Sequence, residues 1–233
     1  MIGRHSLAPT LSNDRLLMRQ RADHPLLRPV LSRLHQTVES HVGAPCEVDL
    51  AERDLLRAVL RRQPIPQVDL RAEGVPLGET AARIATLSVN LANVTLRGTR
   101  RRPTVSADGG SFVATFLEDA IATLVELPPV VERLWLLGDG IRVNMVAGVA
   151  ITCDLCLEDG QIALRPRMPE LLGRRLPWQR LAREVPELPF GAQLETLEVD
   201  GSQVVATGSL SAEHLQWPMG SPRTPRTTSG ASH

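Results

Sequence analysis

Residues 141–164 read IRVNMVAGVAITCDLCLEDGQIAL, and apolar and polar residues alternate along most of this stretch. Alternation with a period of two places every second side chain on the same face of an extended strand. The dipeptide Asp159-Gly160 interrupts the pattern with the residue types that favour a tight hairpin turn. The stretch therefore predicts long antiparallel strands with one apolar face, which comprises Ile141, Val143, Met145, Val149, Ile151, Cys153, Leu155, Leu157, Ile162 and Leu164.

The same pattern recurs in three other parts of the chain. Residues 193–210 repeat the alternation, and Asp139-Gly140 and Asp200-Gly201 repeat the turn chemistry. Residues 67–73 and 84–97 predict the first strands of the sheet. In 84–97 the apolar positions change from odd to even numbers, which predicts a β-bulge near Ala92-Asn93 and a bent strand.

The composition describes a chain of 233 residues with an aliphatic core, because 42% of its residues are hydrophobic but only 3% are aromatic. Its formal net charge is zero, and all of its basic residues are arginine. Few rings are thus available to stack on bases, and no excess charge attracts nucleic acid or an anionic membrane as a whole. Three cysteines, an odd number, fit a reducing compartment.

The N-terminal region predicts two helices before the sheet. Apolar residues recur at helical spacing over residues 24–41. A pattern like a capping box, formed by Asp49 and Glu52, opens a second helix that Pro64 ends. We therefore expect a helical extension over 1–63, an α+β domain over 64–217 and a disordered tail over 218–233.

No export signal or membrane-spanning segment is expected. Charged residues interrupt residues 1–30, and no apolar run approaches the roughly 18 residues of a transmembrane helix. The sequence therefore predicts a cytoplasmic protein, with membrane association as the alternative.

Residues 111–126 predict a helix, since their apolar residues form a wide stripe at helical spacing. A stripe of this width suits a helix that lies inside a curved sheet. Residues 177–184 predict a short helix with proline in its first turn. The expected fold is thus α+β, with a curved antiparallel sheet wrapped on an amphipathic helix and two N-terminal helices before it.

No group of residues suggests catalysis or a bound metal. Cys153 and Cys156 form a C-x-x-C pair, but an offset of three in a strand places them on opposite faces. The six histidines show no ligand spacing; His35 and His41, for example, fall on different faces of a helix. We therefore expect no enzymatic activity, no catalytic residue, no metal and no cofactor.

The densest charge cluster consists of Arg97, Arg100, Arg101 and Arg102, in a loop before Pro103. Guanidinium groups match phosphate oxygens, so the cluster could contact a phosphate headgroup. The alternative is a solvated loop after a strand. Contact with nucleic acid is not expected, because the chain is neutral and lacks aromatic residues among the arginines.

Several short segments follow one another in a recognisable order, namely VDLRAEGVPL at 68–77, the strand over 84–97, the segment 112–125, the hairpin over 140–166, LPFGAQL at 188–194 and VDGSQVV at 199–205. In this order, over residues 66–212, they resemble the LmeA-like family of bacterial phospholipid-binding proteins. The resemblance implies a curved antiparallel sheet around a helix, related to tubular lipid-binding domains, and a lipid-binding role without catalysis. Members of the family typically begin with an export signal or anchor, whereas this chain begins with polar helical segments.

The sequence thus favours binding of a phospholipid or another acyl-chain ligand, with peripheral contact to a membrane. Each buried methylene would contribute about 0.8 kcal/mol. The expected groove residues are Phe112, Phe116, Ala120, Ile121, Leu124, Val143, Met145 and Ile151, with the arginine cluster at the headgroup. Two alternatives remain: the apolar faces fill one another as a closed core, or the N-terminal helices bind a protein partner.

Overall fold

The computed structural model describes residues 27–78, 80–99, 102–125, 129, 131–138, 140–146, 148–158, 161–167, 170–171, 174–175, 181–185 and 188–219. The helices and strands are α1 (Arg28–Val42), β1 (Cys46–Asp49), α2 (Glu52–Arg61), β2 (Ile65–Pro76), β3 (Arg83–Thr99), β4 (Arg102–Ser106), β5 (Gly109–Leu117), α3 (Glu118–Leu124), β6 (Val131–Leu137), β7 (Gly140–Met145), β8 (Ala150–Glu158), β9 (Gln161–Pro166), β10 (Glu170–Leu171), β11 (Arg174–Arg175), β12 (Leu181–Glu184), η2 (Pro189–Gly191), β13 (Ala192–Asp200), β14 (Gln203–Ser211), η3 (Ala212–His214) and β15 (Gln216–Pro218).

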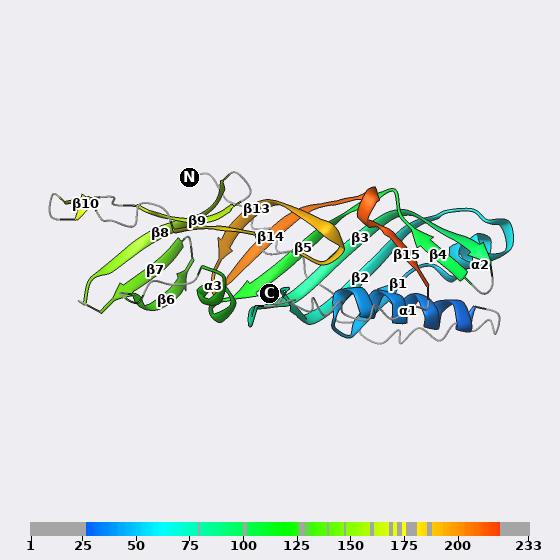
Figure 1. The fold of residues 1–233 in the computed structure, drawn as a ribbon, viewed down its shortest axis with the longest axis horizontal. Helices are drawn as coiled ribbons and strands as arrows, with labels where there is room; N and C mark the ends of the chain where they lie inside the picture. The colour runs from blue at the N-terminus through cyan, green and yellow to red at the C-terminus, as the bar shows by residue number, and fades with distance from the viewer. Residues whose placement is uncertain are drawn as a thin grey trace, which may run out of the picture.

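Within the described residues, most strands belong to two antiparallel sheets (Figure 1). The larger sheet has eight strands: six follow the order β1-β2-β3-β5-β14-β13, while β4 pairs with β3 and β15 with β4. The smaller sheet has five strands in the order β12-β9-β8-β7-β6. This architecture of antiparallel strands with a few helices fits the predicted α+β class.

The smaller sheet is an insertion in the larger one along the chain. Strands β5 and β14 are neighbours in the larger sheet, where Gly109 pairs with Ser211 and Leu117 with Gln203. Between them in sequence lie α3, the smaller sheet and β13. The two sheets meet where β13 contacts β8 and β6.

Helix α1 lies along the β1–β2 part of the larger sheet and contacts both strands (Figure 1). It buries Leu34, Val38 and Val42 and ends at Gly43, whose left-handed conformation (φ 72°) lets its N–H donate to the Glu39 carbonyl at 2.8 Å. Strand β1 follows directly and pairs with β2. The region 1–63, predicted as helical, therefore also contributes an edge strand to the sheet.

The prediction of one helix over 111–126 is wrong for its first half. Residues up to Leu117 form strand β5, which buries Phe112, Ala114 and Phe116 on one face and pairs with β3 and β14. Only α3 is helical, and it begins where acidic residues favour a helix N-terminus. Pairing on both sides satisfies the backbone of β5, which outweighs a helical spacing of apolar residues.

The β-bulge predicted in β3 is wrong. Gln67 pairs with Ala92 and Ile65 with Val94, so neither strand has an extra residue at this point. Instead, Asn93 adopts a positive φ of 51°. The buried face therefore changes side through a turn of the backbone at Asn93, a residue type that tolerates this conformation.

The alternation over 141–164 correctly predicts strands β7, β8 and β9 and their hairpins. Glu158 pairs with Gln161, so the β8–β9 connection falls at residues 159–160, which lie outside the described residues. The turn expected at Asp200-Gly201 is shifted by one residue, since Asp200 pairs with Gln203. The turn expected at Asp139-Gly140 is also displaced by one residue, but toward the N-terminus, because Gly140 already pairs with Leu137.

The short helix predicted over 177–184 is wrong where the structure describes it. Residues Leu181–Glu184 form β12, an edge strand that pairs with β9. The unpaired edge of β9 offers these residues backbone hydrogen bonds, which a short helix with fraying ends could not match. Residues 177–180 lie outside the described residues.

The structure describes the first two residues of the predicted tail, Pro218 and Met219. Pro218 ends β15, and Met219 is buried. Trp217 packs against the ring of His41 on α1 at 5.3 Å and against Phe190 at 5.2 Å, measured between ring centroids. Residues 220–233, the rest of the predicted tail, lie outside the described residues.

Candidate functional site

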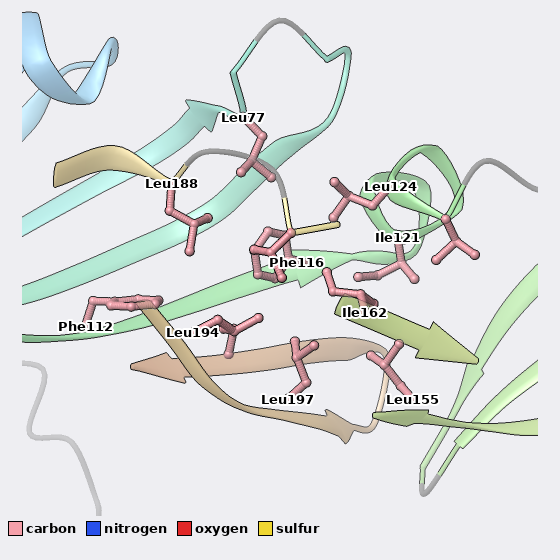
Figure 2. A pocket seen from close by; sticks show the side chains of 13 residues that line it. Leu77, Phe112, Phe116, Ile121, Leu124, Leu155, Ile162, Leu188, Leu194 and Leu197 are labelled. Carbon is pink, nitrogen blue, oxygen red and sulfur yellow. The ribbon is translucent and has the colours of Figure 1, made fainter. Parts of the chain in front are cut away.

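An apolar cavity lies where the two sheets meet (Figure 2). It encloses about 430 Å³ of space between its lining atoms, including the part that opens to solvent, and it is narrow. Its walls consist of Leu77, Phe112, Phe116, Ile121, Leu124, Val125, Leu155, Ile162, Val185, Leu188, Leu194, Leu197 and Ala206.

The larger sheet supplies the floor of the cavity. Phe112 and Phe116 share the buried face of β5 because side chains alternate along a strand. Leu194 and Leu197 of β13 differ by three positions, which in a regular strand places two side chains on opposite faces. An irregularity in the register between Leu194 and Thr196 brings both to the cavity.

Helix α3 and the smaller sheet close the other sides. Ile121 and Leu124 are three residues apart on α3, so they lie on one face of the helix. The N–H of Leu136 on β6 donates to the Glu118 carboxylate at 3.2 Å, which joins the start of α3 to the smaller sheet. The β8–β9 hairpin adds two more apolar side chains, as Figure 2 shows.

A second, smaller apolar cavity of about 220 Å³ lies beside the first. Phe112 and Leu188 line both cavities and therefore form the partition between them. The remaining lining residues are Ile84, Leu87, Val89, Pro189, Phe190, Ala192 and Leu210. Phe190, in the short turn η2, lines this second cavity, and its backbone has a positive φ of 62°.

The chemistry of both cavities is that of apolar contact alone. None of the described residues that line them carries a titratable side chain or a side-chain hydrogen-bond donor. Such walls can bury hydrocarbon, but they offer no group for acid–base or nucleophilic steps. Leu155, Val185, Leu194 and Leu197 are only half-buried and mark the side of the first cavity that solvent reaches.

The structure brings four of the predicted groove residues together in the first cavity, namely Phe112, Phe116, Ile121 and Leu124. The other four do not line it. Ala120 is buried elsewhere on α3. Val143 and Ile151 pair with each other across β7 and β8 in the interior of the smaller sheet, and Met145 is half-buried at the end of β7.

Arg97, the one member of the arginine cluster whose side chain is described, lines neither cavity. Arg97 is exposed and pairs with Thr104 near the end of β3. At about 3.3 Å per residue, the part of β3 from Val89, its last cavity-lining residue, to Arg97 spans at most roughly 25 Å, because the backbone turns at Asn93 in between. Arg100 and Arg101 lie outside the described residues, as does the side chain of Arg102, whose backbone begins β4.

Sequence reasoning missed most of the cavity residues that come from outside β5 and α3. Leu155 and Ile162 stood on the predicted apolar face, but nothing indicated that this end of the hairpin meets β13. Leu77 and Leu188 lie in connecting segments, and the short motifs around them were the only signal available.

The two cysteines of the C-x-x-C pair lie on different faces of β8. Cys153 is 1% exposed, and burial, followed by the charge of Asp154, raises the pKa of its thiol to about 11. Cys156 is half-buried on the other face, where its thiol donates to Glu158 Oε1 at 3.4 Å. This placement does not allow the pair to form a disulfide or to bind one metal ion together.

None of the helices in the described part of the chain has the length and apolar character needed to cross a membrane.

Comparisons with protein-family models, with curated proteins and with solved structures found no match for this chain.

Proposed function

We propose that the protein binds a phospholipid or another acyl-chain ligand, without catalysis, in the first apolar cavity. The observation that carries this proposal is a space lined only by hydrocarbon, with a half-buried rim, between two sheets. The sequence predicted a sheet wrapped around a long helix; in this proposal the shorter helix α3 forms only one wall of the lipid site. The LmeA-like resemblance stays a prediction, because no family model matches.

An acyl chain would enter by widening the cavity rather than by filling a preformed tube. The space between the walls is narrow, so Leu155, Val185, Leu194 and Leu197 would have to rotate outward first. Each methylene then removed from water contributes about 0.8 kcal/mol, which offsets the cost of the rearrangement once several are buried. The headgroup would remain at the rim, not at Arg97, where it could contact a membrane surface during uptake.

The experiment that tests this proposal is the uptake of a fluorescent fatty acid by the purified protein, together with native mass spectrometry for co-purified lipid. Leu124→Trp should reduce uptake at least tenfold, because the larger ring occupies the cavity. Its melting temperature should fall little, since the ring needs only the outward rotation of the half-buried rim that the ligand itself requires.

Leu117→Trp is the matched control. Leu117 is the last residue of β5, and its side chain is 54% exposed on the face opposite to Phe116. A tryptophan at this position should therefore change neither uptake nor stability. The proposal fails if the wild type carries no lipid and takes up no fatty acid while Leu124→Trp is strongly destabilised. That result would show a filled core, for which overpacking costs about 1 to 3 kcal/mol.

The second candidate function is a protein-interaction module that uses the N-terminal helices. One observation favours it: α2 exposes Leu60 at 65% and Val59 at 38%, although its other face packs on β2 and β3. No residue of α1 or α2 lines either cavity, so these helices neither close nor form the proposed lipid site. The absence of lipid uptake by the wild type would favour this candidate.

A further inference from the structure

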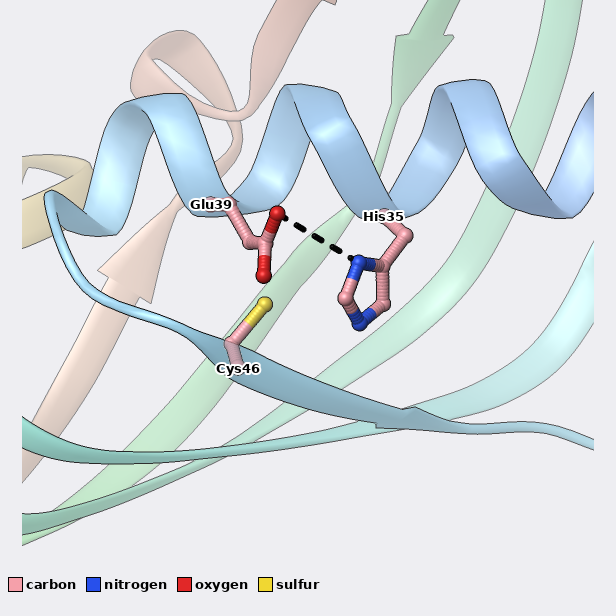
Figure 3. Close-up of side chains that lie close together, drawn as sticks. All are labelled: His35, Glu39 and Cys46. Carbon is pink, nitrogen blue, oxygen red and sulfur yellow. Dashed lines mark ion pairs between the residues drawn. The ribbon is translucent and has the colours of Figure 1, made fainter. Parts of the chain in front are cut away.

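Three potential metal ligands converge between α1 and β1, on a part of the molecule that the lipid proposal does not use (Figure 3). His35 and Glu39 lie one turn apart on α1, and Cys46 is the first residue of β1. His35 Nδ1 lies 3.5 Å from Glu39 Oε2. One ligand atom from each of the three side chains lies within 4.8 Å of the others.

From this geometry we propose that His35, Glu39 and Cys46 bind one zinc ion, with a fourth coordination position open to solvent. Bond lengths of about 2.0 to 2.3 Å in a tetrahedral site place neighbouring ligand atoms roughly 3.3 to 3.8 Å apart. The three ligand atoms therefore need to approach one another by about 1.5 Å or less. The His35 and Glu39 side chains are 44% and 35% exposed, so both have room to rotate toward the ion.

The backbone around the site is fixed in a way that supports metal binding. Gly43 ends α1 through its bond to the Glu39 carbonyl, and Cys46 pairs with Ala72 in the sheet. The turn between α1 and β1 therefore holds Cys46 beneath the histidine and the carboxylate, as Figure 3 shows. The ion would link the helix to the edge strand, and it could enter from the exposed side of α1.

The chemistry of the three groups selects the class of metal. A thiolate, an imidazole and a carboxylate together suit zinc, whereas magnesium and calcium prefer oxygen ligands alone. Burial and the nearby Glu39 carboxylate raise the pKa of the Cys46 thiol to about 11, so both disfavour a second negative charge here. A divalent cation reverses this balance, because it attracts both the thiolate and the carboxylate and displaces the thiol proton.

The test uses the full-length protein, treated with a chelator and then titrated with cobalt(II), which reports zinc-type sites through its absorption. The expected spectrum has a sulfur-to-cobalt charge-transfer band and the visible bands of tetrahedral cobalt, saturates at one ion per chain and is abolished by added zinc. Zinc should also raise the melting temperature, because binding to the folded state stabilises it.

Cys46→Ser should abolish the charge-transfer band, and His35→Ala and Glu39→Gln should each weaken zinc binding at least tenfold. Cys156→Ser is the matched control, since it removes another cysteine that is at least as accessible, and it should leave the spectrum unchanged.

If Cys46→Ser does not fold, the zinc affinity of His35→Ala tests the proposal instead, because the His35 side chain is partly exposed and its loss should not prevent folding. Unchanged zinc affinity in His35→Ala, or a charge-transfer band that Cys156→Ser removes, would overturn the proposal. Loss of zinc binding should leave fatty-acid uptake intact, which separates this site from the lipid site.

Discussion

Replacing Gly208 by alanine is expected to destabilise the protein by about 3 kcal/mol or more, at the upper end of overpacking effects. A Cβ atom at this buried position would clash with the backbone oxygen of Gln193 and lie 2.6 Å from the ring of Phe112. Gly208 pairs with Phe112 on one side and with Leu194 on the other. The backbone oxygen cannot rotate away, so the ladder between β13 and β14 would have to shift.

Urea denaturation of the variant beside the wild type measures this effect as a lower midpoint. Gly138→Ala is the control, because a Cβ there meets no atom within 4 Å. Its midpoint should stay within experimental error of the wild type. Equal stability of Gly208→Ala and the wild type would show that β13 and β14 do not approach each other as closely as described.

The second large effect is expected for Cys153→Asp, which should lower the free energy of unfolding by about 3 to 5 kcal/mol at neutral pH. Cys153 is 1% exposed and faces the interior of the smaller sheet, where it pairs with Ile141. The burial that raises the pKa of this thiol would oppose a carboxylate at the same place even more strongly. Cys156→Asp, on the half-buried face, should cost several times less.

The pH dependence of Cys153→Asp identifies the cause. Burial raises the pKa of the introduced carboxyl group above its ordinary value of about 3.9, which it keeps in the unfolded chain. Between these two pKa values the folded state binds the extra proton, so the free energy of unfolding falls as the pH rises. Urea midpoints at pH 5 and pH 8 should therefore diverge from the wild type more at pH 8. A penalty independent of pH would indicate a packing defect instead of a buried charge.

The sequence predicts best those strands whose outer face is polar. Over residues 141–164 and 193–210 the alternation is clear, and the strands and hairpins are found there. Strand β5 escaped prediction because it carries apolar residues on both faces: Val113 and Leu117 are exposed, while Phe112 and Phe116 are buried. Together these residues imitate the stripe of a helix, which pairing with neighbouring strands overrides.

Both candidate sites contain residues that local patterns in the sequence could not predict. Phe112 and Leu124 could be singled out because they stand in one conspicuous apolar segment, whatever its secondary structure. Leu194 and Leu197 reach the same cavity only through an irregular register, which no spacing rule indicates. The zinc proposal depends on a similar contact: His35 and Glu39 have helical spacing, but only the pairing of β1 with β2 brings Cys46 to them.

The insertion of the smaller sheet between β5 and β14 has a consequence for folding during synthesis. Strand β5 can pair with β3 as soon as it emerges, but its other edge waits for β14. At a synthesis rate of about 5 to 20 residues per second, the intervening chain takes roughly 5 to 20 seconds to appear. During that interval an edge strand with exposed valine and leucine remains open to pairing with other chains. The nascent chain is thus most prone to aggregation before its last long hairpin is made, and chaperones would protect it most in that interval.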